Sequence, residues 1–154
     1  MTSHSWIDEL LAIELEFYTK GESIRSEIGQ FLSLLSEDRS SFFSSTIQKK
    51  QFTTTYYPFV NRIDQHLGAL ELLVRKLGSV LEKGEQQMAC DLLTRGGLVL
   101  EGYWEFANAI HTFLEETEGI LRRSSDALPL SDLRANTLRL SYQADRFCVF
   151  FSKE

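Results

Sequence analysis

The sequence predicts an all-α fold in a single domain that spans residues 1–154. Only two prolines and nine glycines interrupt the 154 residues, so few helix breakers are present. Hydrophobic residues make up 43% of the chain and charged residues 25%, which is typical of a soluble globular protein and too apolar for a disordered one. We expect about six helices joined by short connections.

The clearest predicted helix runs from Phe59 to Glu82. Its apolar residues recur every three or four positions with charged residues between them, and they are Phe59, Ile63, Leu67, Leu70, Val74, Leu77 and Leu81. Pro58 suits the first turn of this helix, because proline has no amide hydrogen to donate. Gly84 is expected to end it. Residues 51–57 are β-branched and aromatic, but no second segment offers to pair with them, so helix or loop is expected there.

Five further helices complete the prediction, at about residues 5–18, 22–35, 85–94, 98–122 and 131–151. Gly21 is expected to separate the first two, and Gly96-Gly97 to separate the next two, because glycine favours helix ends. Residues 124–129 are predicted as a loop. The buried side of the last helix is expected to include Leu133, Leu138, Tyr142, Phe147 and Phe150.

The net charge and the apparent lack of targeting signals predict which partners the protein binds and in which cellular compartment it works. The net charge is −6 with a pI near 5.1, and the basic residues are scattered, so neither nucleic acid nor an anionic membrane is an expected partner. We see neither a signal peptide nor an apolar stretch of about 20 residues that would span a bilayer. Cys90 and Cys148 are too few for a disulfide framework. We therefore expect a cytoplasmic protein with two buried, reduced thiols.

Catalytic and metal-binding motifs are not apparent, so we do not expect an enzyme. The sequence has no nucleophile elbow, phosphate-binding glycine loop, dinucleotide fingerprint or Cys-x-x-Cys pair. His111 and Glu115, one helical turn apart, are a lone pair of the kind common on helix surfaces. Arg62 and His66 loosely resemble the Arg…His pair of HEPN-type ribonucleases, but the spacing is a residue short.

Several segments resemble bacterial sensor globins, and in particular the heme-less globins that form the sensory half of stressosome proteins. The residues that carry the resemblance are 89–98 (ACDLLTRGGL), Tyr103-Trp104, 31–35 with Phe42-Phe43, and 143–147. Leu93 occupies the position of the proximal histidine, so the resemblance implies a member without heme. It also implies a globin-like fold, a homodimer and a role in stress signalling through a protein partner, such as a signalling scaffold or kinase.

The resemblance further implies a small apolar or fatty-acyl ligand in the former heme cavity, although aromatic residues such as Tyr103 and Trp104 also suit ordinary core packing. This pocket would lie between the 59–82 helix and residues 93–106. Its expected apolar lining is Leu70, Leu93, Leu98 and Trp104, and its polar end is His66 or Tyr103. The alternative for His66 is a core histidine whose ring nitrogens are hydrogen-bonded within the protein.

A second interpretation is a small acidic helical-bundle adaptor, such as an antitoxin, an immunity protein or an anti-sigma-type regulator. Its negative charge would attract a basic protein partner. The arrangement of the helices distinguishes the two interpretations. Globin-like crossings favour the sensor, and an up-and-down bundle favours the adaptor.

Overall fold

The structure is a computed structural model that describes residues 5–36, 46–86 and 90–152. Four long helices make up nearly all of this part of the chain, and they confirm the all-α class. They are α1 (Ser5–Ser36), α2 (Lys49–Gln86), α3 (Cys90–Arg123) and α4 (Leu130–Ser152). Two short strands, β1 (Thr46–Gln48) and β2 (Ala127–Pro129), lie between helices. The expectation of about six helices is wrong.

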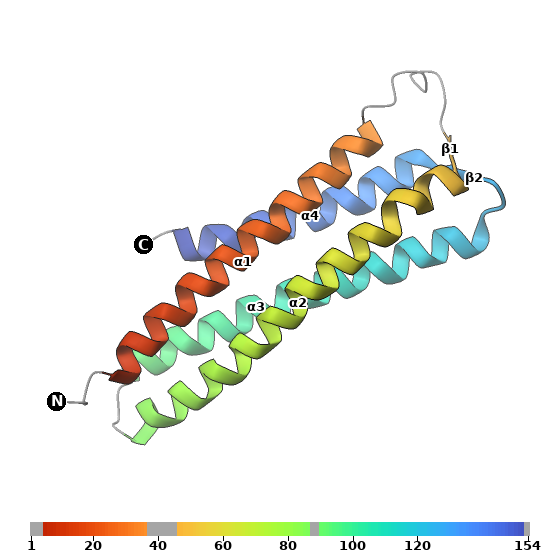
Figure 1. Cartoon of the computed structure of the whole chain (residues 1–154). Coiled ribbons are helices and arrows are strands. Elements are labelled where there is room, and N and C mark those ends of the chain that lie inside the picture. The colour runs from red at the N-terminus through yellow and green to blue at the C-terminus, as the bar shows by residue number, and fades with distance from the viewer. Residues whose placement is uncertain (1–4, 37–45, 87–89, 153–154) are drawn as a thin grey trace.

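The four helices form an up-and-down bundle (Figure 1). Each helix packs against its neighbour in the chain, and α4 returns to pack against α1. The ion pairs Glu9–Lys83 and Glu27–Arg62 join α1 to α2. Since the residue number rises in α1 as it falls in α2, these two helices run antiparallel. This is the arrangement expected of the adaptor interpretation.

Gly21 and Gly96 lie inside helices rather than at their ends, which is why the helices are fewer and longer than expected. A Cβ at Gly21 would lie 2.8 Å from two ring atoms of Phe147 in α4, and a Cβ at Gly96 would overlap Leu81 in α2. Both glycines are buried. Each therefore allows a side chain of a neighbouring helix to approach the backbone closely.

The predicted helix at residues 59–82 also extends further than expected, to Lys49–Gln86. Residues 51–57 are helical, so Pro58 lies well inside α2 instead of in its first turn. Phe52 and Tyr56 are buried and continue the apolar stripe towards the start of the helix. Tertiary packing of these aromatic side chains thus extends the helix through a proline.

At the end of the bundle near β1 and β2, Lys49 at the start of α2 donates hydrogen bonds to carbonyls at and just after the end of α3. The strands pair antiparallel, with Ile47 opposite Leu128, and β2 lies within residues 124–129, which were predicted as a loop. The Lys49 amide donates to the Asp126 carbonyl at 2.7 Å. The Lys49 Nζ donates to the carbonyls of Leu121 at 2.7 Å and Ser124 at 3.3 Å, so one lysine satisfies acceptors at the end of α3.

Aromatic side chains fill much of the bundle's interior. Phe31 and Phe59 stack at 4.4 Å between ring centroids, and Phe106 and Phe147 stack at 4.8 Å. The buried hydrophobic residues of all four helices belong to one core cluster. Across the described helices, none is both long enough and apolar enough to cross a lipid bilayer.

Candidate functional site

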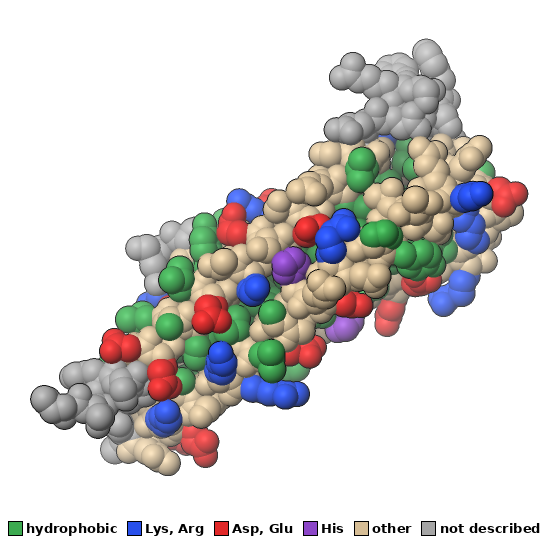
Figure 2. Space-filling view, in the orientation of Figure 1, with side chains coloured by type: hydrophobic (Ala, Val, Ile, Leu, Met, Phe, Trp, Pro, Cys, Tyr) green, Lys and Arg blue, Asp and Glu red, His purple; other side chains and the backbone are tan. Residues whose placement is uncertain are grey.

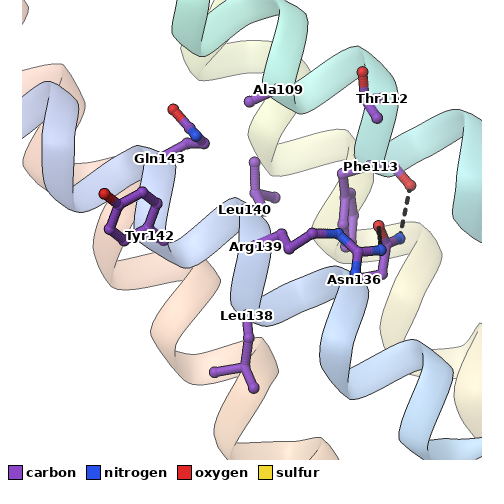
Figure 3. A pocket seen from close by; sticks show the side chains of 9 residues that line it. All are labelled: Ala109, Thr112, Phe113, Asn136, Leu138, Arg139, Leu140, Tyr142 and Gln143. Atoms are coloured by element: carbon purple, nitrogen blue, oxygen red, sulfur yellow. Dashed lines mark hydrogen bonds between the residues drawn. The ribbon is translucent and has the colours of Figure 1, made fainter.

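Two adjoining hollows lie along the line where α3 meets α4. The first has a volume of about 450 Å³ and is shown in Figure 3. Its lining is Ala109, Thr112, Phe113, Asn136, Leu138, Arg139, Leu140, Tyr142 and Gln143. The second, of about 480 Å³, shares Tyr142 and Gln143 and continues to Phe150. Together the two hollows form a groove along most of α4.

Large apolar side chains stand on the outer side of α4 beside this groove. Leu138 is 54% exposed, Tyr142 is 62% exposed and Val149 is 46% exposed. Their spacing of four and seven residues places them on one side of the helix, opposite the buried Leu140 and Ala144. Leu138 and Tyr142 extend away from α3 in Figure 3. We call Leu138, Tyr142 and Val149 the α4 outer row.

Charged side chains border the α4 outer row as pairs of opposite sign. Arg139 Nη2 lies 2.9 Å from Glu116 Oε2, and Arg146 Nη2 lies 3.9 Å from Glu105 Oε2. Both pairs link α4 to α3 across the groove. All four side chains are at least 47% exposed, so solvent screens the pairs and each contributes little to folding stability. The border of the row is therefore close to neutral.

Beneath the groove, a buried polar side chain fixes α4 on α3. The Asn136 amide is 3% exposed and donates to the Phe113 carbonyl at 3.1 Å and to the Thr117 hydroxyl at 2.8 Å. Arg139 donates weakly to the Asn136 carbonyl oxygen at 3.4 Å. A buried amide that satisfies specific partners favours one register of two helices over others. Asn136 thus holds α4, and with it the outer row, in place on α3.

Tyr56 lies further inside the core, and its hydroxyl has no hydrogen-bond partner among the described residues. Burial raises the pKa of Tyr56, and the nearby Glu118 raises it further, while Thr117 acts in the opposite direction. The neutral phenol is therefore the form that the core holds. With its ring stacked on Phe52 at 5.1 Å, Tyr56 acts as a core residue.

The six residues predicted to line an apolar pocket are not gathered around one cavity. Leu70 and Tyr103 point into the core, whereas Leu98 is 48% exposed and Trp104 is 57% exposed. Leu93 is half-buried. The rings of Tyr103 and Trp104 do touch, with centroids 5.4 Å apart, but they face different surroundings.

His66 lies at the edge of α2 and faces polar residues of α1. It lines a shallow hollow with Tyr18, Thr19, Glu22, Ser23, Ser26 and Glu27. The residues one turn away on its own helix, Ile63 and Leu70, are buried in the core. The structure thus places His66 beside hydroxyl and carboxylate groups, not at the end of an apolar chamber. Arg62, from the weak ribonuclease-like pattern, donates to Glu27 at 2.6 Å.

Metal ligands and thiols were also candidates in the sequence. Within the described ranges, no group of three or more His, Cys, Asp or Glu side chains could hold a metal ion, and His111 and Glu115 are both exposed. Both cysteines are free thiols. Cys148 is buried as expected, and desolvation together with a hydrogen bond to Glu22 raises its pKa to about 12. Cys90 is exposed, so the expectation of two buried thiols is wrong for it.

Sequence reasoning assigned Leu138, Tyr142 and Phe150 to the buried side of the last helix, and that assignment is wrong for all three. The prediction is correct for Leu133 and Phe147, which are buried with Leu140 on one stripe of α4, but it mixed them with residues of a second apolar stripe on the opposite side. The presence of two apolar stripes on one helix was the signal in the sequence that one of them is exposed. Comparison with protein-family models, curated protein sequences and solved structures gives no match to this chain.

Proposed function

We propose that this chain is a non-catalytic regulatory adaptor that acts by binding protein through α4 and its groove with α3. The α4 outer row carries this proposal. Leu138, Tyr142 and Val149 expose about half or more of their surface along a single helix face. Apolar side chains gathered on one face, rimmed by polar groups, mark surfaces that bind other proteins.

The arrangement of the helices supports the same proposal. An up-and-down bundle is the arrangement that we expect of an adaptor, and the described helices pack in that order. The resemblance to heme-less sensor globins, with its fatty-acyl ligand and its signalling scaffold or kinase, stays a prediction. The core carries packed aromatic rings where helices meet, which favours an action through the surface.

Charge does not mark the surface of α1 and α2 as a binding face. Figure 2 shows acidic and basic side chains interspersed along that face, not gathered by sign. On α1 the exposed apolar residues Leu11 and Leu15 form a pair one turn apart, whereas Tyr57 and Leu72 of α2 lie far apart along the helix. Leu72, at 58% exposure, therefore serves as a matched control for the α4 outer row.

Site-specific photo-cross-linking tests the proposal. A benzophenone amino acid replaces Tyr142 in one variant and Leu72 in another, and each variant is irradiated in the cells that produce it. We expect a discrete protein adduct from position 142 and none from position 72. Equal adducts from both positions, or none from position 142, would contradict the proposal.

A further inference from the structure

The outer face of α4 carries an apolar residue near each end and a hydrogen-bond donor and acceptor between them. Leu138 and Val149 are its apolar ends, and Arg139 and Arg146 lie along its α3 side, where they pair with Glu116 and Glu105. Tyr142 is in the middle, beside Asp145, which is also exposed. A contact between two identical subunits around a two-fold axis needs a patch that complements itself. A helix face with apolar ends and a donor–acceptor pair at its centre meets this condition when two copies run antiparallel.

We propose that two copies of this chain pair through α4, with the two α4 helices antiparallel and the two-fold axis between Tyr142 and Asp145. This proposal rests on the proposed function, in which α4 is the contact face. Leu138 then packs against the partner's Val149. The Tyr142 hydroxyl donates to the partner's Asp145 carboxylate, and the symmetry makes both contacts twice. Positions 138, 142, 145 and 149 have the four-three-four spacing of a helix-pairing seam.

The charge of α4 favours a second copy over the basic partner that the overall charge would attract. The whole chain has a net charge of −6. The α4 helix instead has three arginines, at 134, 139 and 146, against the two aspartates Asp132 and Asp145. A basic protein is therefore not steered to this face. Arg139 and Arg146 already pair with Glu116 and Glu105 of their own chain, so these two arginines bring no unpaired positive charge to the contact.

The exposure of Asp145 agrees with the pairing. Its side chain is 57% exposed, and its ion pair with Arg25 of α1 is long, at 3.8 Å. Its carboxylate can therefore accept a hydrogen bond from outside the chain. From Leu138 to Val149 the seam is about 16 Å long at 1.5 Å per residue. A contact confined to one short helix face is small, so we expect weak pairing, with a dissociation constant on the order of micromolar.

Sedimentation velocity over a concentration series tests the pairing. The unchanged chain is expected to shift from monomer to dimer as its concentration rises through the micromolar range. Leu138→Asp should raise the dissociation constant at least tenfold, because it buries a charge against the partner's Val149. Leu72→Asp, an identical change at a similarly exposed position of α2, should leave the constant unchanged. A chain that stays monomeric at several hundred micromolar, or two variants that weaken pairing equally, would overturn the proposal.

Disulfide trapping tests the orientation. In a Cys90→Ser background, which removes the exposed native thiol, Leu138→Cys and Val149→Cys chains are mixed and oxidised. The antiparallel pairing predicts the mixed 138–149 disulfide. It forbids a 138–138 disulfide, since those positions are about 16 Å apart and a disulfide needs Cα atoms within about 7 Å. A dominant 138–138 product overturns the antiparallel arrangement. Circular dichroism confirms that each variant is folded.

The cross-linking from position 142 separates this inference from the proposed function. An adduct with twice the mass of the chain supports both. An adduct with a different protein, without any self-adduct, leaves the proposed function standing and overturns the pairing. No adduct at all contradicts both.

Discussion

Arg95 of α3 donates two hydrogen bonds to the Glu14 carboxylate of α1. Arg95 Nε lies 2.5 Å from Glu14 Oε1, and Nη2 lies 2.7 Å from Oε2. The Glu14 side chain is only 7% exposed, while that of Arg95 is 36% exposed. The hydrogen bonds to the carboxylate raise the pKa of Arg95, so the guanidinium stays charged. A nearly buried carboxylate thus has its countercharge on a different helix.

Arg95→Ala should therefore lower the free energy of unfolding by about 2 kcal/mol, because it leaves the Glu14 carboxylate buried and unpaired, with the effect reduced by the partial exposure of Arg95. Replacing both residues by leucine should recover most of this loss, since no buried charge remains. Urea denaturation measures all three chains. A double variant no more stable than Arg95→Ala would show that the pair acts through packing rather than charge.

Lys49 and Lys50 provide a second matched test at the other end of the bundle. Lys49→Met should lower the free energy of unfolding by about 1–2 kcal/mol, because the carbonyls of Leu121 and Ser124 lose a charged donor. The side chain of Lys50 is exposed, so Lys50→Met should change it by less than about 0.5 kcal/mol. Thermal unfolding of the two variants decides this. Equal effects would mean that Lys49 does not cap α3 in solution.

The raised pKa of the Cys148 thiol predicts that the free energy of unfolding falls at alkaline pH. Its thiol has a pKa of about 12 in the folded chain, against an ordinary value of 9.0. Since the unfolded chain releases this proton first, stability is complete below pH 9 and falls as the pH rises from 9 towards 12. The fall by pH 10 should be about 1 kcal/mol.

Cys148→Ala should remove this fall, which is measured by urea denaturation at pH 8 and pH 10. Tyr103 and Tyr56, whose pKa values are also raised from 10.0 by burial, contribute mainly above pH 10. A variant that loses as much stability as the unchanged chain between these two pH values would refute the role of Cys148.

The parts of the fold that the sequence predicted well are those where local signals and packing agree. The 59–82 stripe is a true core stripe at Phe59, Ile63 and Leu70. The last helix, expected at residues 131–151, is observed at Leu130–Ser152. It follows Pro129, and a proline close to a helix start limits where that helix can begin.

The remaining features depended on which helices become neighbours. Local propensity treats Gly21 as a helix end, but packing against Phe147 keeps it inside α1. Hydrophobicity alone does not say which of two opposite stripes on α4 faces the core, so Leu138 and Tyr142 were assigned to the wrong side. His66 has polar surroundings only because α1 lies beside it.

Two glycines of α1 test whether close packing explains the unbroken helix. Gly29→Ala should raise the free energy of unfolding by about 0.5–1 kcal/mol, because alanine favours the helix and a Cβ there meets nothing within 4 Å. Gly21→Ala should lower it by about 1–2 kcal/mol, since the cost of overpacking exceeds the same helix gain. The Phe147 ring cannot easily yield, because it packs on Phe106 and Phe151. If Gly21→Ala stabilised the chain as Gly29→Ala does, α4 would lie further from α1 than described, and the outer row would lose its fixed position.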